Sequence, residues 1–271
     1  MRRNPIGLLS GVVVVVYGLV ALFAPWISPY DPTTTNLMAR LAPPTAEHPF
    51  GTDALGRDIL SRTIYGARIS ILIGIATVVV SASVGVFLGT LAGYFGGSLD
   101  RWISRATELL LAFPYLIFAI GMMAFLGPGF VNLIWALSFK GWVEFFRLSR
   151  GETLGQCARE YVEAARALGQ RSRRTIMREI LPNILPAVLV VATLRVGFFI
   201  VLEASLSFLG VGIPPALPAW GSMIAEGRDV LFMAWWVSTI PGVVLLVLVL
   251  SINLLGEALR EVLDPRLSAG T

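Results

Sequence analysis

The chain has 271 residues, of which 56% are hydrophobic and only 14% are charged, and its formal net charge is +4. Soluble domains average roughly 45 to 50% apolar and 25% charged residues, so this composition excludes an ordinary water-soluble fold. A bilayer core about 30 Å thick takes roughly 20 apolar residues per helix, which leaves room for about six spans. We therefore expect an all-α integral membrane protein that forms a single domain over residues 1–271.

The first apolar run covers residues 6–27 and follows Arg2 and Arg3. A signal peptide would have the same basic start, but its apolar region is only about 7 to 15 residues long and ends at an A-x-A site. This run is longer and has no such site. The sequence therefore predicts an uncleaved first span.

The segment after this span, residues 28–66, holds three Arg against four acidic residues. Its only histidine, His48, is expected to have no ligand role, because metal sites need three or four convergent donors. Gly51–Asp58 comes close to a phosphate-binding loop, but Arg57 replaces the essential Lys and Asp58 replaces the Mg²⁺-binding hydroxyl. We expect neither metal nor ATP to bind here.

Five further spans are expected, at residues 69–94, 109–126, 130–148, 187–211 and 235–255. In the second span, small residues recur every four positions at Ser81, Gly85, Gly89 and Gly93. Such a stripe permits close helix packing, with room for substrate as the alternative.

The fourth span is interrupted by Lys140 and Glu144. They stand four residues apart on one helical face, so we expect them to pair with each other and to reach toward the membrane surface.

The segment 147–186 is strongly basic, with eight Arg against four Glu. Cytoplasmic loops carry such an excess, so this segment should be cytoplasmic and residues 28–66 should be outside. Counting spans back to Arg2 and Arg3 puts both termini in the cytoplasm. The net positive charge of the chain is thus explained by its cytoplasmic loops, and nucleic acid is not expected as a partner.

Within the basic segment, residues 153–168 favour a helix in which Glu163 can pair with Arg at positions 159 and 166. Gly169 is a natural helix stop and Ser172 can cap a second helix. Pro182 and Pro186 then mark the return to the membrane. The expected shape is a compact helix, turn and helix.

The motif E-A-A at 163–165, with Gly169 and then Leu181-Pro182, resembles the EAA loop of ABC import permeases. In that family the loop is a coupling helix that sits in a groove of the ATPase subunit. The coupling loop would span residues 149–186. The resemblance assigns ATPase coupling to the matching positions Glu163, Ala164, Ala165, Gly169, Leu181 and Pro182. Glu179 departs from the pattern, which usually has an apolar residue or His there.

Three other segments are similar to the C-type, second permease of dipeptide, oligopeptide and nickel importers: His48–Ser70, Tyr94–Pro114 and Glu203–Arg228. The resemblance covers residues 5–266. Ser104, Glu108 and Glu144 depart from it, since Met, Asp and a small residue are usual there.

The resemblance implies a prokaryotic inner-membrane complex with a homologous permease, two cytoplasmic ATPase subunits and an extracytoplasmic binding protein. ATP and Mg would bind the ATPase subunits, so this chain would be no enzyme and would carry no cofactor or catalytic residue. Peptides, nickel chelates and small glycosides remain open as substrates.

Arg195 and Glu203 lie inside the fifth span, where a charge costs at least about 2.5 to 3.5 kcal/mol. They are about 12 Å apart along the helix, so each needs its own partner. Glu203 is expected either to line the translocation path or to contact the partner permease. Arg195 is expected to be structural.

Two other classes of membrane protein would need different residues. An ATP-independent secondary transporter or channel would carry more ionisable residues in its spans and broken helices at the midplane. A membrane hydrolase would need a catalytic set that one His cannot supply. Co-purification of ATPase subunits separates both from an ABC permease.

The orientation makes a prediction for Cys157, the only thiol in the chain. A membrane-impermeant maleimide should leave it unlabelled in intact spheroplasts and label it in inside-out vesicles from which the ATPases have been stripped. Labelling from the outside would contradict the six-span topology.

Overall fold

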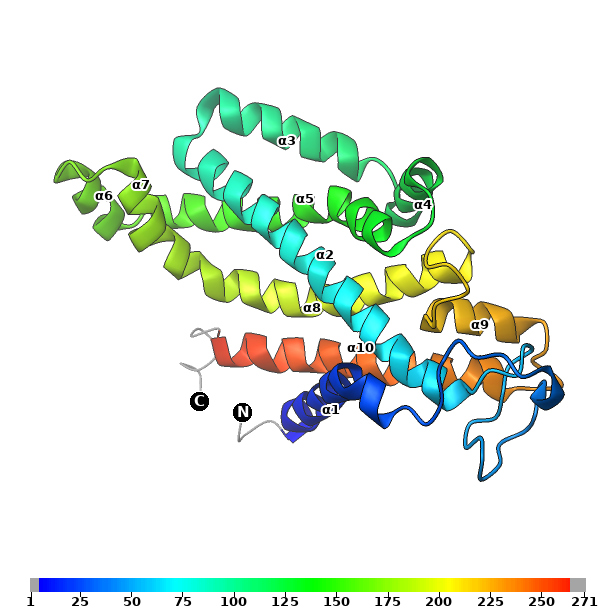
Figure 1. The fold of residues 1–271 in the computed structure, drawn as a ribbon. Helices are drawn as coiled ribbons and strands as arrows, with labels where there is room; N and C mark the ends of the chain where they lie inside the picture. The colour runs from blue at the N-terminus through cyan, green and yellow to red at the C-terminus, as the bar shows by residue number, and fades with distance from the viewer. Residues whose placement is uncertain (1–4, 264–271) are drawn as a thin grey trace.

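The computed structural model describes residues 5–263, and these residues form an all-helical fold (Figure 1). Arg2, Arg3 and both termini lie outside the described residues. The helices are α1 (Pro5–Ile27), η1 (Leu37–Ala39), α2 (Ile59–Phe95), α3 (Gly97–Leu111), α4 (Tyr115–Leu126), α5 (Phe130–Cys157), α6 (Glu160–Ala167), α7 (Ser172–Thr175), the π turn η2 (Ile176–Ile180), α8 (Leu181–Phe208), α9 (Trp220–Arg228) and α10 (Trp236–Leu263).

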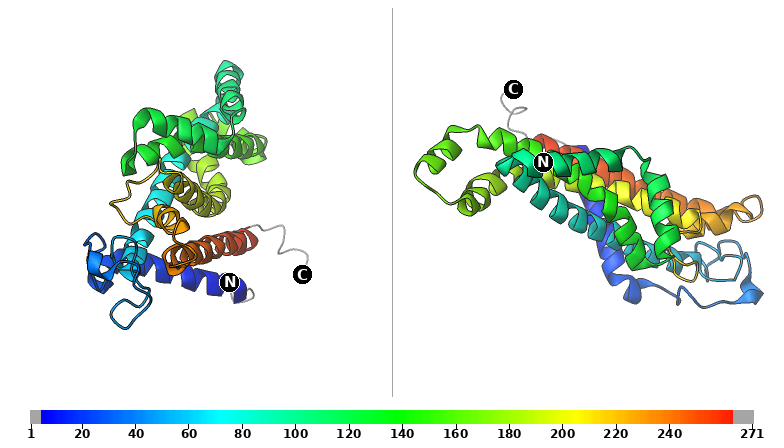
Figure 2. Two further views of the ribbon diagram at one scale, coloured as in Figure 1. Left: turned by 90° about the vertical axis from the view of Figure 1, so that its right-hand side faces the viewer. Right: turned by 90° about the horizontal axis from the view of Figure 1, so that it is seen from above.

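Helix α2 organises the fold by crossing α5, α8 and α10 in turn (Figure 1). The two additional views place α3 at an edge of the molecule, where only Thr107 is buried (Figure 2). The loop with η1 and helix α9 lie at one end of the long helices. The α6 and α7 turns lie at the other end, toward which α10 runs. The elements expected outside and inside the cell are thus separated by the length of the long helices.

The close approach of α2 and α5 depends on the small-residue stripe. A Cβ added to Gly85 would lie 2.5 Å from the Cβ of Phe145, and one added to Gly89 would lie 3.0 Å from the Cβ of Ser149. These distances leave no room for a side chain, so the packing interpretation of the stripe is confirmed.

Two apolar clusters flank α2. One includes Phe145 and Phe199 and joins α2, α4, α5 and α8. The other includes Trp220 and Leu248 and joins α1, α2, α9 and α10. Asp58 caps the start of α2, where its carboxylate accepts the Ser61 N–H at 2.7 Å.

The membrane spans match the expectation only in part. Four helical segments are long and apolar enough to span: Pro5–Ile27, Ile59–Phe95, Ser172–Phe208 and Trp236–Val262. The third expected span, 109–126, is not one helix, because α3 and α4 meet at a bend of 92° and together form a possible fifth span. Helix α5, where the fourth span is expected, is not among these candidates. Residues 5–263 therefore form an all-helical structure with four or five candidate spans.

The expectation that Lys140 pairs with Glu144 is wrong. Lys140 donates to the carbonyl of Phe113, in the bend before α4. Glu144 pairs with Arg195 of α8. Tertiary contacts with the α3–α4 bend and with α8 replace the local pair, which contributes only about 0.2 to 0.5 kcal/mol in a helix.

The basic segment forms a helix, turn and helix with different boundaries. The helix expected over 153–168 is interrupted at residues 158 and 159, since α5 ends at Cys157 and α6 begins at Glu160. The second helix does not end before Pro182, because α7, the π turn and α8 follow one another directly. The Leu181 N–H bonds to the Ile176 carbonyl five residues back. This wider turn directly precedes Pro182, which has no N–H to donate.

Ser172 does not cap this helix, because the cap position is Arg171 and no side-chain cap bond is formed. The expectation that Gly169 stops the first helix is confirmed. Gly169 has a φ of 74°, and the Gln170 N–H bonds to the Ala165 carbonyl at 3.0 Å. This is a glycine-terminated helix end, in which N–H groups beyond the helix bond to carbonyls of its last turn.

The α2–α5 contact predicts that Gly89→Ala destabilises the protein. Alanine favours a helix over glycine by about 1 kcal/mol, but its Cβ would lie 2.5 Å from the Phe146 carbonyl oxygen, so the clash should dominate. The Tm of the detergent-purified protein should fall. Gly18→Ala in α1 is the control, because nothing lies within 4 Å of its Cβ position. An unchanged Tm for Gly89→Ala would contradict the close packing.

Candidate functional site

The α6 turn is held against the membrane helices by a small apolar cluster. Val162 is fully buried and packs with Ile176, Ile180 and Ile184. Arg166 reaches back to α2, where its guanidinium lies 4.6 Å from the centre of the Tyr94 ring. Its Nη2 also contacts the Cys157 sulfur at 3.3 Å. These contacts fix the orientation of α6 relative to α2 and α8.

The fixed orientation exposes one face of α6. Glu163 and Ala164 are exposed, whereas Ala165 is buried on the inner side. Among the ion pairs of residues 5–263, neither of the pairs expected for Glu163 with Arg159 and Arg166 is formed. The Glu163 carboxylate therefore faces outward.

The structure brings only part of the resemblance-derived set together on this face. Glu163, Ala164 and Gly169 are exposed at the tip. Leu181 and Pro182 belong to the first turn of α8, behind the tip. Leu168 was not predicted, although it is 88% exposed beside Gly169. An apolar residue directly before a helix-ending glycine is the sequence signal that could have identified it.

Glu203 is fully buried between α2 and α8. Its carboxylate accepts hydrogen bonds from the Ser70 hydroxyl at 2.8 Å and from the Ser207 hydroxyl at 2.9 Å. Burial of a charge needs such partners, and here both come from this chain. In this conformation Glu203 contributes to the joint between the two helices.

Arg195 pairs with Glu144, so the expectation that Arg195 and Glu203 have separate partners is confirmed. The guanidinium also lies 4.8 Å from the centre of the Phe198 ring, which adds a cation–π contact. The pair is partly open, since 29% of the Arg195 side chain and 46% of the Glu144 side chain remain exposed.

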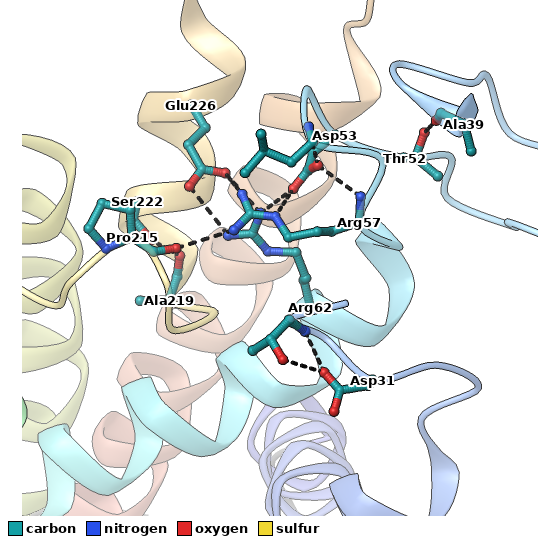
Figure 3. Close-up of polar contacts among 12 residues, drawn as sticks. Asp31, Ala39, Thr52, Asp53, Arg57, Arg62, Pro215, Ala219, Ser222 and Glu226 are labelled. Carbon is teal, nitrogen blue, oxygen red and sulfur yellow. Dashed lines mark hydrogen bonds and ion pairs between the residues drawn. The ribbon is translucent and has the colours of Figure 1, made fainter. Parts of the chain in front are cut away.

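A second ion cluster (Figure 3) joins the start of α2 to α9, and these two elements lie at the opposite end of the long helices from α6 (Figure 1). The Asp53 carboxylate accepts a hydrogen bond from the Arg57 guanidinium at 2.6 Å and another from the Arg62 guanidinium. Asp53 and Arg57 are four residues apart in the chain. Glu226 of α9 lies 2.9 Å from both guanidinium groups. Gly51–Asp58, whose sequence comes close to a phosphate-binding loop without matching it, thus contributes Asp53 and Arg57 to an ion-paired joint between the start of α2 and α9.

The sequence could show only part of this cluster. The spacing of Asp53 and Arg57 is compatible with a local pair, but Glu226 lies more than 160 residues away. His48 lies 2.9 Å from Asp58, the residue that caps α2, and its ring contacts that of Tyr30. Within residues 5–263, no group of three or more His, Cys, Asp or Glu could hold a metal ion.

Residues 85–269 match the family described as "Binding-protein-dependent transport system inner membrane component". Residues 1–44 match "N-terminal TM domain of oligopeptide transport permease C". The chain belongs to this family of inner membrane components of binding-protein-dependent transport systems.

Its relatives include permease proteins of peptide transport systems. It is 40% identical to the di/tripeptide transport system permease protein of Pseudomonas aeruginosa (strain UCBPP-PA14), over 98% of this chain and 89% of the relative. It is 39% identical to the oligopeptide transport system permease protein of Bacillus subtilis (strain 168), over 98% of this chain and 87% of the relative. It is 36% identical to the probable D,D-dipeptide transport system permease protein of Escherichia coli (strain K12), over 98% of this chain and 89% of the relative.

The fold is also similar to a solved structure. A chain of the MetNI methionine ABC transporter in an inward-facing conformation matches with a TM-score of 0.62. The match covers 75% of this chain and 96% of that chain at 18% identity, so it shows the shared fold.

The ion cluster of Asp53, Arg57, Arg62 and Glu226 predicts that Arg62→Met destabilises the protein. The Arg62 side chain is only 1% exposed, and its loss leaves Glu226 and Asp53 with Arg57 as their remaining cation. Breaking a buried pair from one side costs about 3 to 5 kcal/mol, so the Tm should fall by several degrees. Arg68→Met, an exposed position on the same helix, is the matched control. Equal Tm values for the two variants would refute a structural role for the cluster.

Proposed function

We propose that this chain is the membrane-spanning permease subunit of an ATP-driven ABC importer that moves dipeptides or oligopeptides into the cell. The observation that carries the proposal is the similarity, over 98% of the chain, to permease proteins named for peptide transport. Nickel and other small solutes are the alternative cargo from the resemblance. In this proposal an extracytoplasmic binding protein delivers the cargo.

The proposed complex contains a second homologous permease and two cytoplasmic ATPase subunits. We propose six spans, with α3 plus α4 as the third and α5 as the fourth, and both termini in the cytoplasm. ATP and Mg would bind the ATPase subunits, which would carry out hydrolysis. ATP-driven closure of these subunits would then switch the path between the two permeases from one side of the membrane to the other.

Coupling would act through the tip of the α6 turn. We propose that Glu163, Ala164, Ala165 and Gly169 form or support the docking surface, with Leu168 as its apolar contact. Leu181 and Pro182 would connect this surface to α8. The exposed, small side chain of Ala164 supports close approach by a partner, and the buried side of α6 supports transmission of the contact to the membrane helices.

The proposal predicts that Ala164→Trp abolishes peptide uptake and co-purification of the ATPase subunits at unchanged membrane abundance. The indole would fill space that a fitted groove needs, and overpacking costs about 1 to 3 kcal/mol or more. Glu163→Ala should have a smaller effect, because an exposed ion pair contributes only about 0 to 1 kcal/mol.

Leu154→Trp is the control, since this side chain is 45% exposed near the end of α5 and lies outside the proposed docking residues. Normal uptake and co-purification for Ala164→Trp would refute docking through this face. Peptide uptake without any associated ATPase would instead favour an ATP-independent transporter or channel.

A further inference from the structure

A cavity of about 480 Å³ lies between α5, α8 and α10, around the Glu144–Arg195 pair. Its volume falls within the roughly 300 to 1,000 Å³ of small-molecule sites. Residues that line it and bear on the argument are Glu144, Val191, Arg195, Phe198, Val201 and Asn253. The cavity thus joins one anion, one cation and one amide with apolar walls.

The pair lies deep along the long helices. Glu144 is near the middle of α5 (Phe130–Cys157), and Arg195 is near the middle of α8 (Leu181–Phe208). Charged side chains at membrane depth are costly in lipid and face protein or water. Because both side chains remain partly exposed in this chain, the open side of the pair must face a partner or an aqueous path.

The position of α2 shows which side is open. Phe145, Phe146 and Ser149 of α5 face the glycine stripe of α2. Each residue turns a helix by about 100°, so Glu144 projects from the side of α5 that faces away from α2. Helix α2 therefore covers one side of α5, and the charged cavity opens on the other.

The pair keeps polar capacity for a ligand. Among the described residues, one guanidinium nitrogen of Arg195, Nη2, bonds one carboxylate oxygen of Glu144, Oε1. A guanidinium has five N–H donors and a carboxylate has two acceptor oxygens. Phe198 supports the guanidinium from one side, which limits the directions that it can take.

We propose that this cavity is a contact site on the translocation path for a short peptide with free amino and carboxylate ends. Arg195 binds the carboxylate and Glu144 binds the ammonium group, while Asn253 offers an amide to the peptide bond. An extended dipeptide is about 7 Å long. At this length its carboxylate can contact Arg195 while its ammonium group contacts Glu144. This inference rests on the proposed function of a peptide permease and names the residues that such a permease would use.

Photolabelling tests the location directly. The complete complex, with both permeases, ATPases and binding protein, is reconstituted in vesicles and supplied with ATP and a dipeptide carrying a diazirine on its side chain. After illumination, mass spectrometry should find the label on residues around Val191, Phe198 and Val201. Transport of the probe with labels only elsewhere in the chain would overturn the site but leave the proposed function intact. Absence of uptake of every peptide supplied would overturn both.

Substitution tests the chemistry. Glu144→Gln should reduce dipeptide uptake about tenfold, because one charge-assisted contact is lost. Membrane abundance and ATPase stimulation by the loaded binding protein should persist. Glu257→Gln is the control, since this exposed carboxylate lies on α10 outside the cavity lining and its uptake should be unchanged.

The double variant Glu144→Arg, Arg195→Glu separates substrate contact from a purely structural pair. It keeps the pair but exchanges the positions of the charges, so a bound peptide would have to reverse its direction. Wild-type abundance with uptake still reduced about tenfold supports the proposal. Recovery of wild-type uptake would show that the pair is only structural and would overturn the proposal.

Discussion

The close contact of α2 with α5 is the constraint on which the arrangement of the other helices depends. Without side chains at Gly85, Gly89 and Gly93, the α2 backbone approaches that of α5 over several turns. In a membrane the lipid is as apolar as the helices, so the hydrophobic effect does not drive helices together there as it does in water. Close packing has to supply the favourable free energy of association instead. The contact also sets the rotation of α5, which turns Glu144 away from α2 and toward α8.

Charged residues join the helices at several points along their length. At one end, Asp53, Arg57, Arg62 and Glu226 connect the start of α2 to α9. Glu203 connects α8 to α2 through Ser70, and Glu144 connects α5 to Arg195 of α8. Toward the other end, Arg150 of α5 pairs with Asp100 of α3. Each contact joins a different pair of elements, so the charges of this apolar chain also specify which helices are neighbours.

The class of protein and most helices could be predicted from the sequence because they follow from local properties. Apolar runs identified the helices, the four-residue period of small side chains identified a packing face, and Gly169 identified a helix end. The E-A-A motif and its neighbours led to the correct family.

The errors arose where tertiary contacts outweigh local spacing. Lys140 and Glu144 have the right separation for a pair, but a carbonyl before α4 and an arginine on α8 are the partners that they meet. The third span could not be recognised as bent, because an apolar window does not record the turn at residues 112–114. Glu226 could not be joined to Arg57 by any local pattern. Its place depends on how α9 returns against α2.

The unbroken helical path from Ser172 to Phe208 gives the proposed coupling a physical route. The α6 tip is packed onto its first turns through Val162, Ile176 and Ile180, so a force on the tip acts on the start of this path. Farther along, the same path carries Arg195 at the charged cavity and then Glu203 at the joint with α2. A rotation or shift of this one element would therefore change the cavity and the α2–α8 joint together. The π turn at Ile176–Ile180 is the irregular point of the path, and it lies between the proposed docking surface and both polar contacts.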